Sequence, residues 1–161
     1  MQPKQERYVG NILTAARHLL AVINDILDLA KLQSGKTRLE LSPFSLRELL
    51  DEAVGLMQPL SARKRQRLEV SLPDDLPDLR ADRGKVLQIL MNLLSNAHKF
   101  TPDDRAIRIS AVLGPAAVVI AVADEGIGIA AGDLPTLFDE FLQVDHSPTK
   151  GYPQGTGLGL A

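Results

Sequence analysis

Three polar side chains recur along the apolar segment between residues 82 and 100. Asn92, Asn96 and Lys99 are spaced four and three residues apart, so on a helix they would share one face beside the apolar one. The amide oxygen of asparagine is a ligand that hard cations such as Mg²⁺ accept, and a lysine ammonium is a point charge for phosphate. Taken alone, these three residues are explained more simply as a solvated helix face, and a ligand site is the alternative that stays open.

A second candidate site follows an apolar stretch that ends at Asp124. The segment DEGIGIAAG, residues 124–132, places Gly126 and Gly128 directly after this carboxylate. Glycines let a backbone approach a ligand closely, and a carboxylate can accept a hydrogen bond from that ligand. The spacing differs from the G-x-G-x-x-G of dinucleotide-binding folds, and a turn that binds nothing explains it as well.

A third candidate is the closely spaced glycines of GTGLGLA, residues 155–161. Such glycines can present successive N–H groups to phosphate oxygens. The chain contains no G-x-x-x-x-G-K-[ST] sequence, so this is not a Walker loop. Taken by itself, the pattern indicates no more than a flexible tail.

The elements that must position these segments follow from hydrophobic periodicity. Helices are predicted over 5–34, 45–63, 82–100 and 134–141, and strands over 67–73, 106–113 and 117–124. Ser45 and Glu48 have capping-box spacing at the start of the second helix, which Pro59 is expected to kink or shorten. The order predicts an α+β fold, with helices on one face of a sheet whose other face can stay open.

The first predicted helix has a heptad seam: Val9, Leu13, Ala16, Leu20, Ile23, Leu27 and Ala30. A second stripe runs beside it: Ile12, Leu19 and Ile26. A stripe of that width must be covered from two sides, so it predicts a helix of a multi-helix bundle that needs a partner. Gly35 provides the stop signal.

Composition limits the function classes. The 161 residues are 45% hydrophobic and 24% charged with a net charge of -2, which argues against a general nucleic-acid binder. There is no cysteine, so a disulfide scaffold and a thiolate metal site are excluded. The longest apolar runs are too short for a membrane span, and no export signal follows Met1, so a cytoplasmic protein is expected.

Each candidate segment is a weak signal by itself, but their order along the chain is specific. NLLSNAHKFTP at 92–102, DEGIGIA at 124–130, FDEF at 138–141 and GTGLGL at 155–160 resemble, in order, the N, G1, F and G2 boxes of the histidine-kinase ATP-binding domain. HLLAVINDILDLAKLQSGK, residues 18–36, resembles the second helix of the dimerisation and histidine-phosphotransfer hairpin that precedes this domain in sensor kinases.

The resemblance implies the fold and the domain organisation. The fold would be the α/β sandwich of the histidine-kinase ATPase, or Bergerat, type, incomplete at its C-terminus because the chain ends in the G2 box. The resemblance divides the chain into the second hairpin helix at 1–36, a linker at 37–44 and the ATP-binding domain at 45–161.

The resemblance also implies roles along the 82–100 helix. Asn96 would bind Mg²⁺, Lys99 would contact phosphate and Phe100 would line the adenine pocket. Asn92 matches the position where related ATPases carry a general-base glutamate. Since transfer to a histidine requires no activated water, an amide there suits a kinase.

In the later boxes, Asp124 would accept the adenine amino hydrogen, with Gly126 and Gly128 permitting the close turn. A mobile ATP lid would be anchored and closed by these residues: Phe138, Phe141, Gly155, Thr156, Gly157, Leu158 and Gly159. Pro153 and Gln154 stand where many members have a shorter glycine-rich stretch, so a phosphate role for Lys150 stays open.

The implied activity is transfer of the ATP γ-phosphate to a histidine outside this chain, then to an aspartate of a response-regulator receiver domain. His18, His98 and His146 do not match the phosphoacceptor, so the chain is expected to have little or no activity alone. ATP and Mg²⁺ are the implied cofactors, and the N-terminal helix would form the homodimer of the full protein. No contact with nucleic acid or membrane is expected.

Two alternatives remain. One is a gyrase-, mismatch-repair- or heat-shock-chaperone-type ATPase, against which Asn92 and the heptad helix both argue. The other is a pseudokinase that acts by dimerisation and partner binding, against which Asn96, Lys99 and Asp124 argue.

Overall fold

The computed structural model describes residues 38–137, together with individual helical positions between residues 5 and 27. Contacts divide the chain into two compact units, Met1–Arg38 and Leu39–Ala161. The division falls inside the predicted linker, and each unit is described by itself.

In the first unit, the described positions are helical and exposed: Gln5, Arg7–Gly10, Ile12, Leu13, Ala15, Ala16, Leu19, Leu20, Ile23 and Leu27. These positions agree with the predicted helix. They include apolar side chains of both predicted stripes, among them Val9, Ile12 and Leu20, which lie on the surface of this unit. Gly35 lies outside the described residues.

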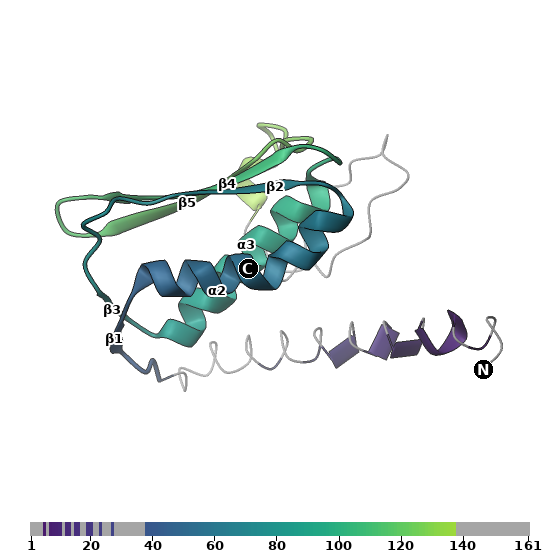
Figure 1. Cartoon of the computed structure of the whole chain (residues 1–161), viewed down its shortest axis with the longest axis horizontal. Helices are drawn as coiled ribbons and strands as arrows, with labels where there is room; N and C mark the ends of the chain where they lie inside the picture. Colours follow the sequence, from purple (N-terminus) through teal and green to yellow (C-terminus); the bar gives the residue numbers. More distant parts are fainter. Residues whose placement is uncertain are drawn as a thin grey trace. The chain divides into compact units, whose positions relative to one another are not determined.

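The second unit packs two helices against one face of a three-stranded sheet (Figure 1). The helices are α2 (Leu46–Arg63) and α3 (Arg83–Phe100), and the strands are β2 (Arg67–Ser71), β4 (Ala106–Leu113) and β5 (Val118–Asp124). The strand order is β2-β4-β5, with β2 parallel to β4 and β4 antiparallel to β5. The predicted layering is confirmed. Parallel β2 and β4 need a crossover, which the segment containing α3 supplies.

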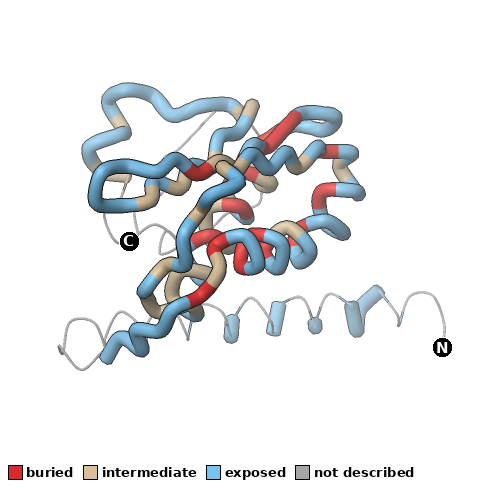
Figure 2. The backbone as a smooth tube through the Cα atoms, turned by 60° about the vertical axis from the view of Figure 1, so that its left-hand side comes forward, coloured by how far each residue is buried: buried red, intermediate tan, exposed pale blue. Residues whose placement is uncertain are grey.

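The core lies between the helices and the sheet. Along β4, Ile107, Ile109 and Ala111 are buried while Arg108 and Val112 are exposed, which is the period-two alternation of a sheet covered on one side. Figure 2 shows buried segments on both the helices and the strands. The helices contribute these buried residues: Leu46, Leu49, Leu50, Ala53, Met57, Leu90, Leu94 and Ala97.

Two short strands were not predicted from the sequence. β1 (Ser42–Phe44) pairs antiparallel with β3 (Leu79–Ala81). Each is only three residues long, too short for an alternating pattern to identify a strand, so there was no local signal to find. The pair joins the residues just before α2 to those just before α3, and therefore sets where both helices begin.

Both helix starts are capped by side chains. Ser45 Oγ accepts a hydrogen bond from the Glu48 N–H at 3.3 Å, as the capping-box spacing predicted. Asp82 Oδ1 does the same for the Lys85 N–H at 3.0 Å.

Pro59 was expected to kink or shorten α2; it does not shorten the helix, which continues through it to the predicted end at Arg63. Pro59 lies on the exposed side, whereas Met57 and Ser61 on either side of it are buried. Their packing outweighs the single backbone hydrogen bond that proline cannot donate. Two predicted boundaries also shift: β2 ends at Ser71, and a 3₁₀ turn covers Leu134–Thr136 where a longer helix was expected. Residues 138–141 lie outside the described part.

Candidate functional site

The predicted polar face of the 82–100 segment lies on α3. Asn92, Asn96 and Lys99 are partly buried along its last two turns. Among the described residues, no hydrogen bond reaches the side chain of either asparagine. The Lys99 Nζ atom lies 4.7 Å from the centroid of the Phe100 ring, and burial lowers the pKa of Lys99. The face therefore offers two amide groups and one cation close to an aromatic ring.

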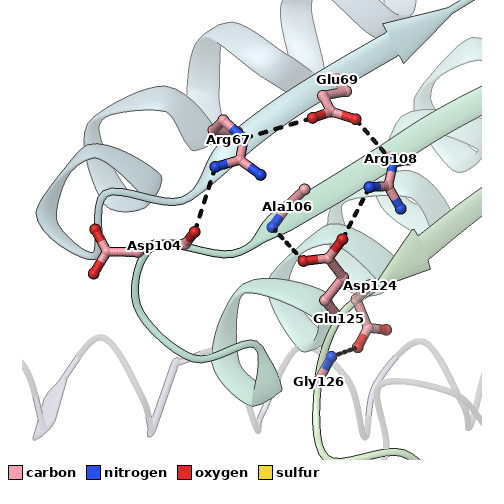
Figure 3. Close-up of polar contacts among 8 residues, drawn as sticks. All are labelled: Arg67, Glu69, Asp104, Ala106, Arg108, Asp124, Glu125 and Gly126. Atoms are coloured by element: carbon pink, nitrogen blue, oxygen red, sulfur yellow. Dashed lines mark hydrogen bonds and ion pairs between the residues drawn. The ribbon is translucent and has the colours of Figure 1, made fainter.

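The DEGIG segment forms a tight turn directly after β5. Asp124 Oδ1 accepts a hydrogen bond from the Gly126 N–H at 2.8 Å, and Figure 3 shows the other carboxylate oxygen directed away from this bond. Gly128 has φ of 72°, in the left-handed region that favours glycine. The turn thus orients Asp124 through its own backbone and leaves one of its oxygens able to accept another hydrogen bond.

The turn and the end of α3 meet at Gly126. A Cβ atom on this glycine would lie 2.9 Å from the Phe100 carbonyl oxygen and 2.5 Å from Asp124 Oδ1. Only a residue without a side chain allows the two segments to approach this closely. The contact places the Asp124 turn against the C-terminal end of α3, although the two segments are separate in the sequence.

Glu125, which sequence reasoning missed, is fixed by a chain of polar contacts across the sheet (Figure 3). Its carboxylate accepts from the Ala106 N–H at 3.3 Å and from Arg108 Nη2 at 2.9 Å, and Arg108 Nε also donates to Glu69 at 2.9 Å. The Ala106 N–H and then Arg108 hold the pKa of Glu125 below its usual range. Exposed ion pairs add little stability, so their main effect is to orient the residue between Asp124 and Gly126. The available signal in the sequence was the alternating charges of Arg67 and Glu69 in β2 and the single charge of Arg108 in β4.

A second network that the sequence did not indicate surrounds the end of α3. Lys64 Nζ donates to the carbonyl oxygens of His98 and Lys99, at 2.8 and 3.2 Å, and the buried Gln66 amide donates to that of Thr101 at 2.7 Å. Gln66 Oε1 lies 2.6 Å from His98 Nδ1. Burial, and then the charge of Lys64, lower the pKa of His98.

The donor set limits which metal could bind. Within residues 38–137 and the described helical positions, no group of three or more His, Cys, Asp or Glu side chains could hold an ion. Asn92 and Asn96 offer neutral oxygens instead. Mg²⁺ commonly takes one or two protein ligands and completes its shell with water and substrate phosphates. The residues therefore fit Mg²⁺ that binds together with a phosphate ligand.

One cavity of about 230 Å³ lies between α2 and β2, lined by Val54, Gln58, Ser61, Ala62, Gln66 and Leu68. None of the predicted site residues lines it. The described part of the chain also has no helix with the length and apolarity needed to cross a membrane.

The remaining predicted residues lie outside the described part of the structure. They are Phe138, Phe141, Lys150, Gly155, Thr156, Gly157, Leu158 and Gly159, together with His18 and His146.

Comparison with known proteins gives the family to which the chain belongs. The family of histidine kinase-, DNA gyrase B- and HSP90-like ATPases matches residues 81–161. The chain is 40% identical to the non-motile and phage-resistance protein of Caulobacter vibrioides, with 97% of this chain and 19% of that protein aligned. It is 39% identical to the sensor protein GacS of Pseudomonas syringae, over 99% of this chain and 18% of that protein.

Among solved structures, full-length ShkA in complex with AMPPNP superposes with a TM-score of 0.84 at 32% identity, covering 99% of this chain and 33% of ShkA. The chain thus spans less than a fifth of the length of either curated relative. The residues that match the family, 81–161, include α3, the Asp124 turn and the segment that follows it. The ATPase domain is homologous to that of sensor histidine kinases of two-component signalling, and the chain belongs to the histidine kinase-, DNA gyrase B- and HSP90-like ATPase family.

Proposed function

We propose that this chain is the ATP-binding part of a sensor histidine kinase. It would position ATP so that the γ-phosphate passes to a histidine outside these residues and then to an aspartate of a response regulator. The observation that carries the proposal is the close approach of Gly126 to the Phe100 carbonyl, which puts the Asp124 turn against the end of α3. The relatedness to GacS and to the AMPPNP-bound ShkA supports it.

Asp124 would recognise the adenine base. Its Oδ1 is held by the Gly126 N–H, so the second oxygen can accept a hydrogen from the exocyclic amino group. Phe100 would line the pocket at the end of α3. Gly128 keeps the turn compact because its left-handed backbone strains other residues.

The phosphates would bind along α3. Lys99 supplies a positive charge that is already partly desolvated, which strengthens its attraction for a phosphate. Mg²⁺, held by the Asn96 amide oxygen and by phosphate oxygens, would supply further neutralisation of negative charge. Phosphoryl transfer depends mainly on such positioning and charge neutralisation.

The side chain of Asn92 favours phosphoryl transfer to histidine over ATP hydrolysis. An amide cannot remove a proton from water, so this side chain would orient the reacting groups rather than activate a nucleophile. This favours transfer to histidine over the ATP hydrolysis of the gyrase and chaperone branches of the family.

The rest of the proposal extends to residues and partners beyond the site. We infer the domain boundaries 1–36, 37–44 and 45–161, with the ATP lid formed by the F-box phenylalanines and the glycines at 155–159. The exposed apolar side chains of the first unit support a homodimer through the N-terminal helix. A kinase that uses ATP and a response regulator would work in the cytoplasm.

Replacing Asp124 with asparagine tests the proposal. Asp124→Asn keeps an oxygen for the Gly126 N–H but turns an NH₂ donor toward the adenine amino group, so two donors would face each other. We expect the affinity for Mg-ADP in calorimetry to fall about tenfold or more. The affinity for inosine diphosphate, which presents a carbonyl oxygen there, should be retained or rise.

Asp75→Asn is the matched control, since it removes the same charge at an exposed position between β2 and β3. It should leave both affinities unchanged. Equal Mg-ADP affinity in the Asp124 and Asp75 variants, or no binding by the unaltered chain, would contradict the assignment.

A further inference from the structure

The junction between α2 and β2 reaches the C-terminal end of α3. Lys64 directly follows α2, and its Nζ atom lies 2.8 Å from the His98 carbonyl oxygen, 3.2 Å from that of Lys99 and 3.2 Å from that of Thr101. One ammonium group therefore directs all three of its hydrogen-bond donors at the last residues of α3 and at the residue that follows the helix.

Gln66, two residues after Lys64, also donates hydrogen bonds to the carbonyl groups at the end of α3. Its side-chain NH₂ group lies 2.7 Å from the Thr101 carbonyl oxygen and 3.2 Å from that of His98. Gln66 is only 7% exposed, so few water molecules can replace these contacts.

These contacts satisfy groups that a helix leaves without partners. The last four carbonyl groups of an α-helix have no intrahelical donor, and they carry the negative end of the helix dipole. A cation at this position is favourable, and the partial burial of Lys64 reduces its screening by solvent. The end of α3 is thereby held by the segment that joins α2 to β2, in addition to the hydrogen bonds within α3 itself.

The fixed residues are those that form the candidate site. Lys99 and Phe100 lie between the capped carbonyls, and the Phe100 carbonyl is the group against which Gly126 packs. A small shift of this turn would move the Lys99 side chain and open the contact that joins α3 to the Asp124 turn.

We propose that Lys64 and Gln66 are positioning residues of the nucleotide site, which hold the end of α3 so that Lys99, Phe100 and the Asp124 turn share one geometry. This inference rests on the proposed nucleotide-binding function. Neither residue touches the nucleotide in this proposal; both act through the α3 backbone.

Among residues 38–137, the two arginines beside Lys64 donate no side-chain hydrogen bond to the end of α3. Arg63 is exposed in the last turn of α2 and, within the described part, makes no hydrogen bond or ion pair through its side chain. Arg65 Nε pairs with Asp104 Oδ1 at 2.6 Å. Lys64 differs from these arginines in the carbonyl oxygens that it contacts and not in its charge. Arg63 carries the same charge without these contacts, so it is a suitable control position.

The test compares Lys64→Met with Arg63→Met by calorimetry with Mg-ADP, at a temperature where both variants are fully folded. Each change removes one positive charge from the same helix end. We expect Lys64→Met to weaken Mg-ADP binding about tenfold and Arg63→Met to change it less than about twofold. Lys64→Arg, which keeps donors for the carbonyls, should recover most of the affinity.

A spectroscopic signature accompanies the affinity. Without nucleotide, the amide resonances of Phe100, Thr101 and Gly126 should shift in Lys64→Met and stay in place in Arg63→Met. If Lys64→Met does not fold, Gln66→Met provides the same comparison, because it keeps the ammonium contacts while it removes the amide donors.

The outcomes separate the two proposals. If the unaltered chain binds Mg-ADP and Lys64→Met binds it equally well, the positioning role is overturned and the nucleotide site stands. If Lys64→Met lowers the unfolding midpoint while the affinity is unchanged, its role is structural only and the inference is again overturned. If the unaltered chain does not bind Mg-ADP, the proposed function fails and the inference fails with it.

Discussion

Gln66 fixes which ring nitrogen of neutral His98 carries the hydrogen. The side-chain nitrogen of Gln66 lies among carbonyl oxygens, which can only accept, so that nitrogen must be the NH₂ group and Oε1 must face His98. The Nδ1 atom of the imidazole therefore carries the hydrogen. A second proton on this ring would place a charge beside Lys64, in partly buried surroundings.

This arrangement predicts a loss of folding stability in mild acid. Burial and then Lys64 lower the pKa of His98, so the unfolded chain takes up the proton at a higher pH than the folded protein does. The contribution of His98 to the free energy of unfolding is complete above its ordinary pKa of about 6.5 and is lost as the pH falls through the lower folded value.

The measurement is urea unfolding at about pH 7.5 and about pH 5.5, a range above the main titration of Asp and Glu side chains. His98→Gln, which can still donate to Gln66 Oε1, should lose less stability between these two pH values than the unaltered chain does. An equal loss in both proteins would mean that His98 does not cause the pH dependence.

At the scale of elements, the start of α3 depends on one carboxylate. Asp82 Oδ1 caps the helix through the Lys85 N–H, and Asp82 Oδ2 accepts from the Glu40 N–H at 3.1 Å. These hydrogen bonds, first that of Lys85 and then that of Glu40, lower the pKa of Asp82. The residue therefore joins the segment before β1 to the helix that carries the candidate site.

We predict that Asp82→Ala lowers the free energy of unfolding, the usual effect of removing an N-cap. Asp82→Asn should lose less, since an amide oxygen can still accept from the Lys85 N–H. Chemical denaturation measures both, with Asp78→Ala as a control, because Asp78 is exposed and lies just before β3. A control variant that loses as much as Asp82→Ala would refute the capping role.

At the scale of the whole second unit, stability depends on the single layer of side chains between helices and sheet. Its outer sheet face is polar at one end, where Arg67, Glu69 and Arg108 pair, and apolar at the other, where Val112 and Val119 are exposed. The exposed pairs contribute little, so the free energy of folding comes mainly from the buried layer.

Two apolar residues of α3 test this view. Leu94 is 0% exposed, whereas Ile89 is 58% exposed. Leu94→Ala should lower the free energy of unfolding by about 2–5 kcal/mol, a large part of the roughly 5–15 kcal/mol of a typical domain, and Ile89→Ala by less than about 1 kcal/mol. Urea denaturation should give a clearly lower midpoint for Leu94→Ala than for Ile89→Ala. Similar midpoints for the two variants would mean that the layer around Leu94 is not the main source of stability.

The sequence by itself determined the features that depend on neighbouring residues. The cap at Ser45, the extent of α3 and the glycine turn after Asp124 could all be predicted, because a capping side chain, a helical repeat and a tight turn act within a few positions. The shared face of Asn92, Asn96 and Lys99 followed from the helical repeat alone.

Only the tertiary structure decided how these parts meet. The parallel pairing of β2 with β4, the β1–β3 pair, the packing of Gly126 on Phe100 and the capping of α3 by Lys64 and Gln66 join residues that are far apart in the chain. No local pattern encodes such contacts, because they depend on the path of the backbone between the two partners. The candidate site exists because these contacts bring the end of one helix to the turn after one strand.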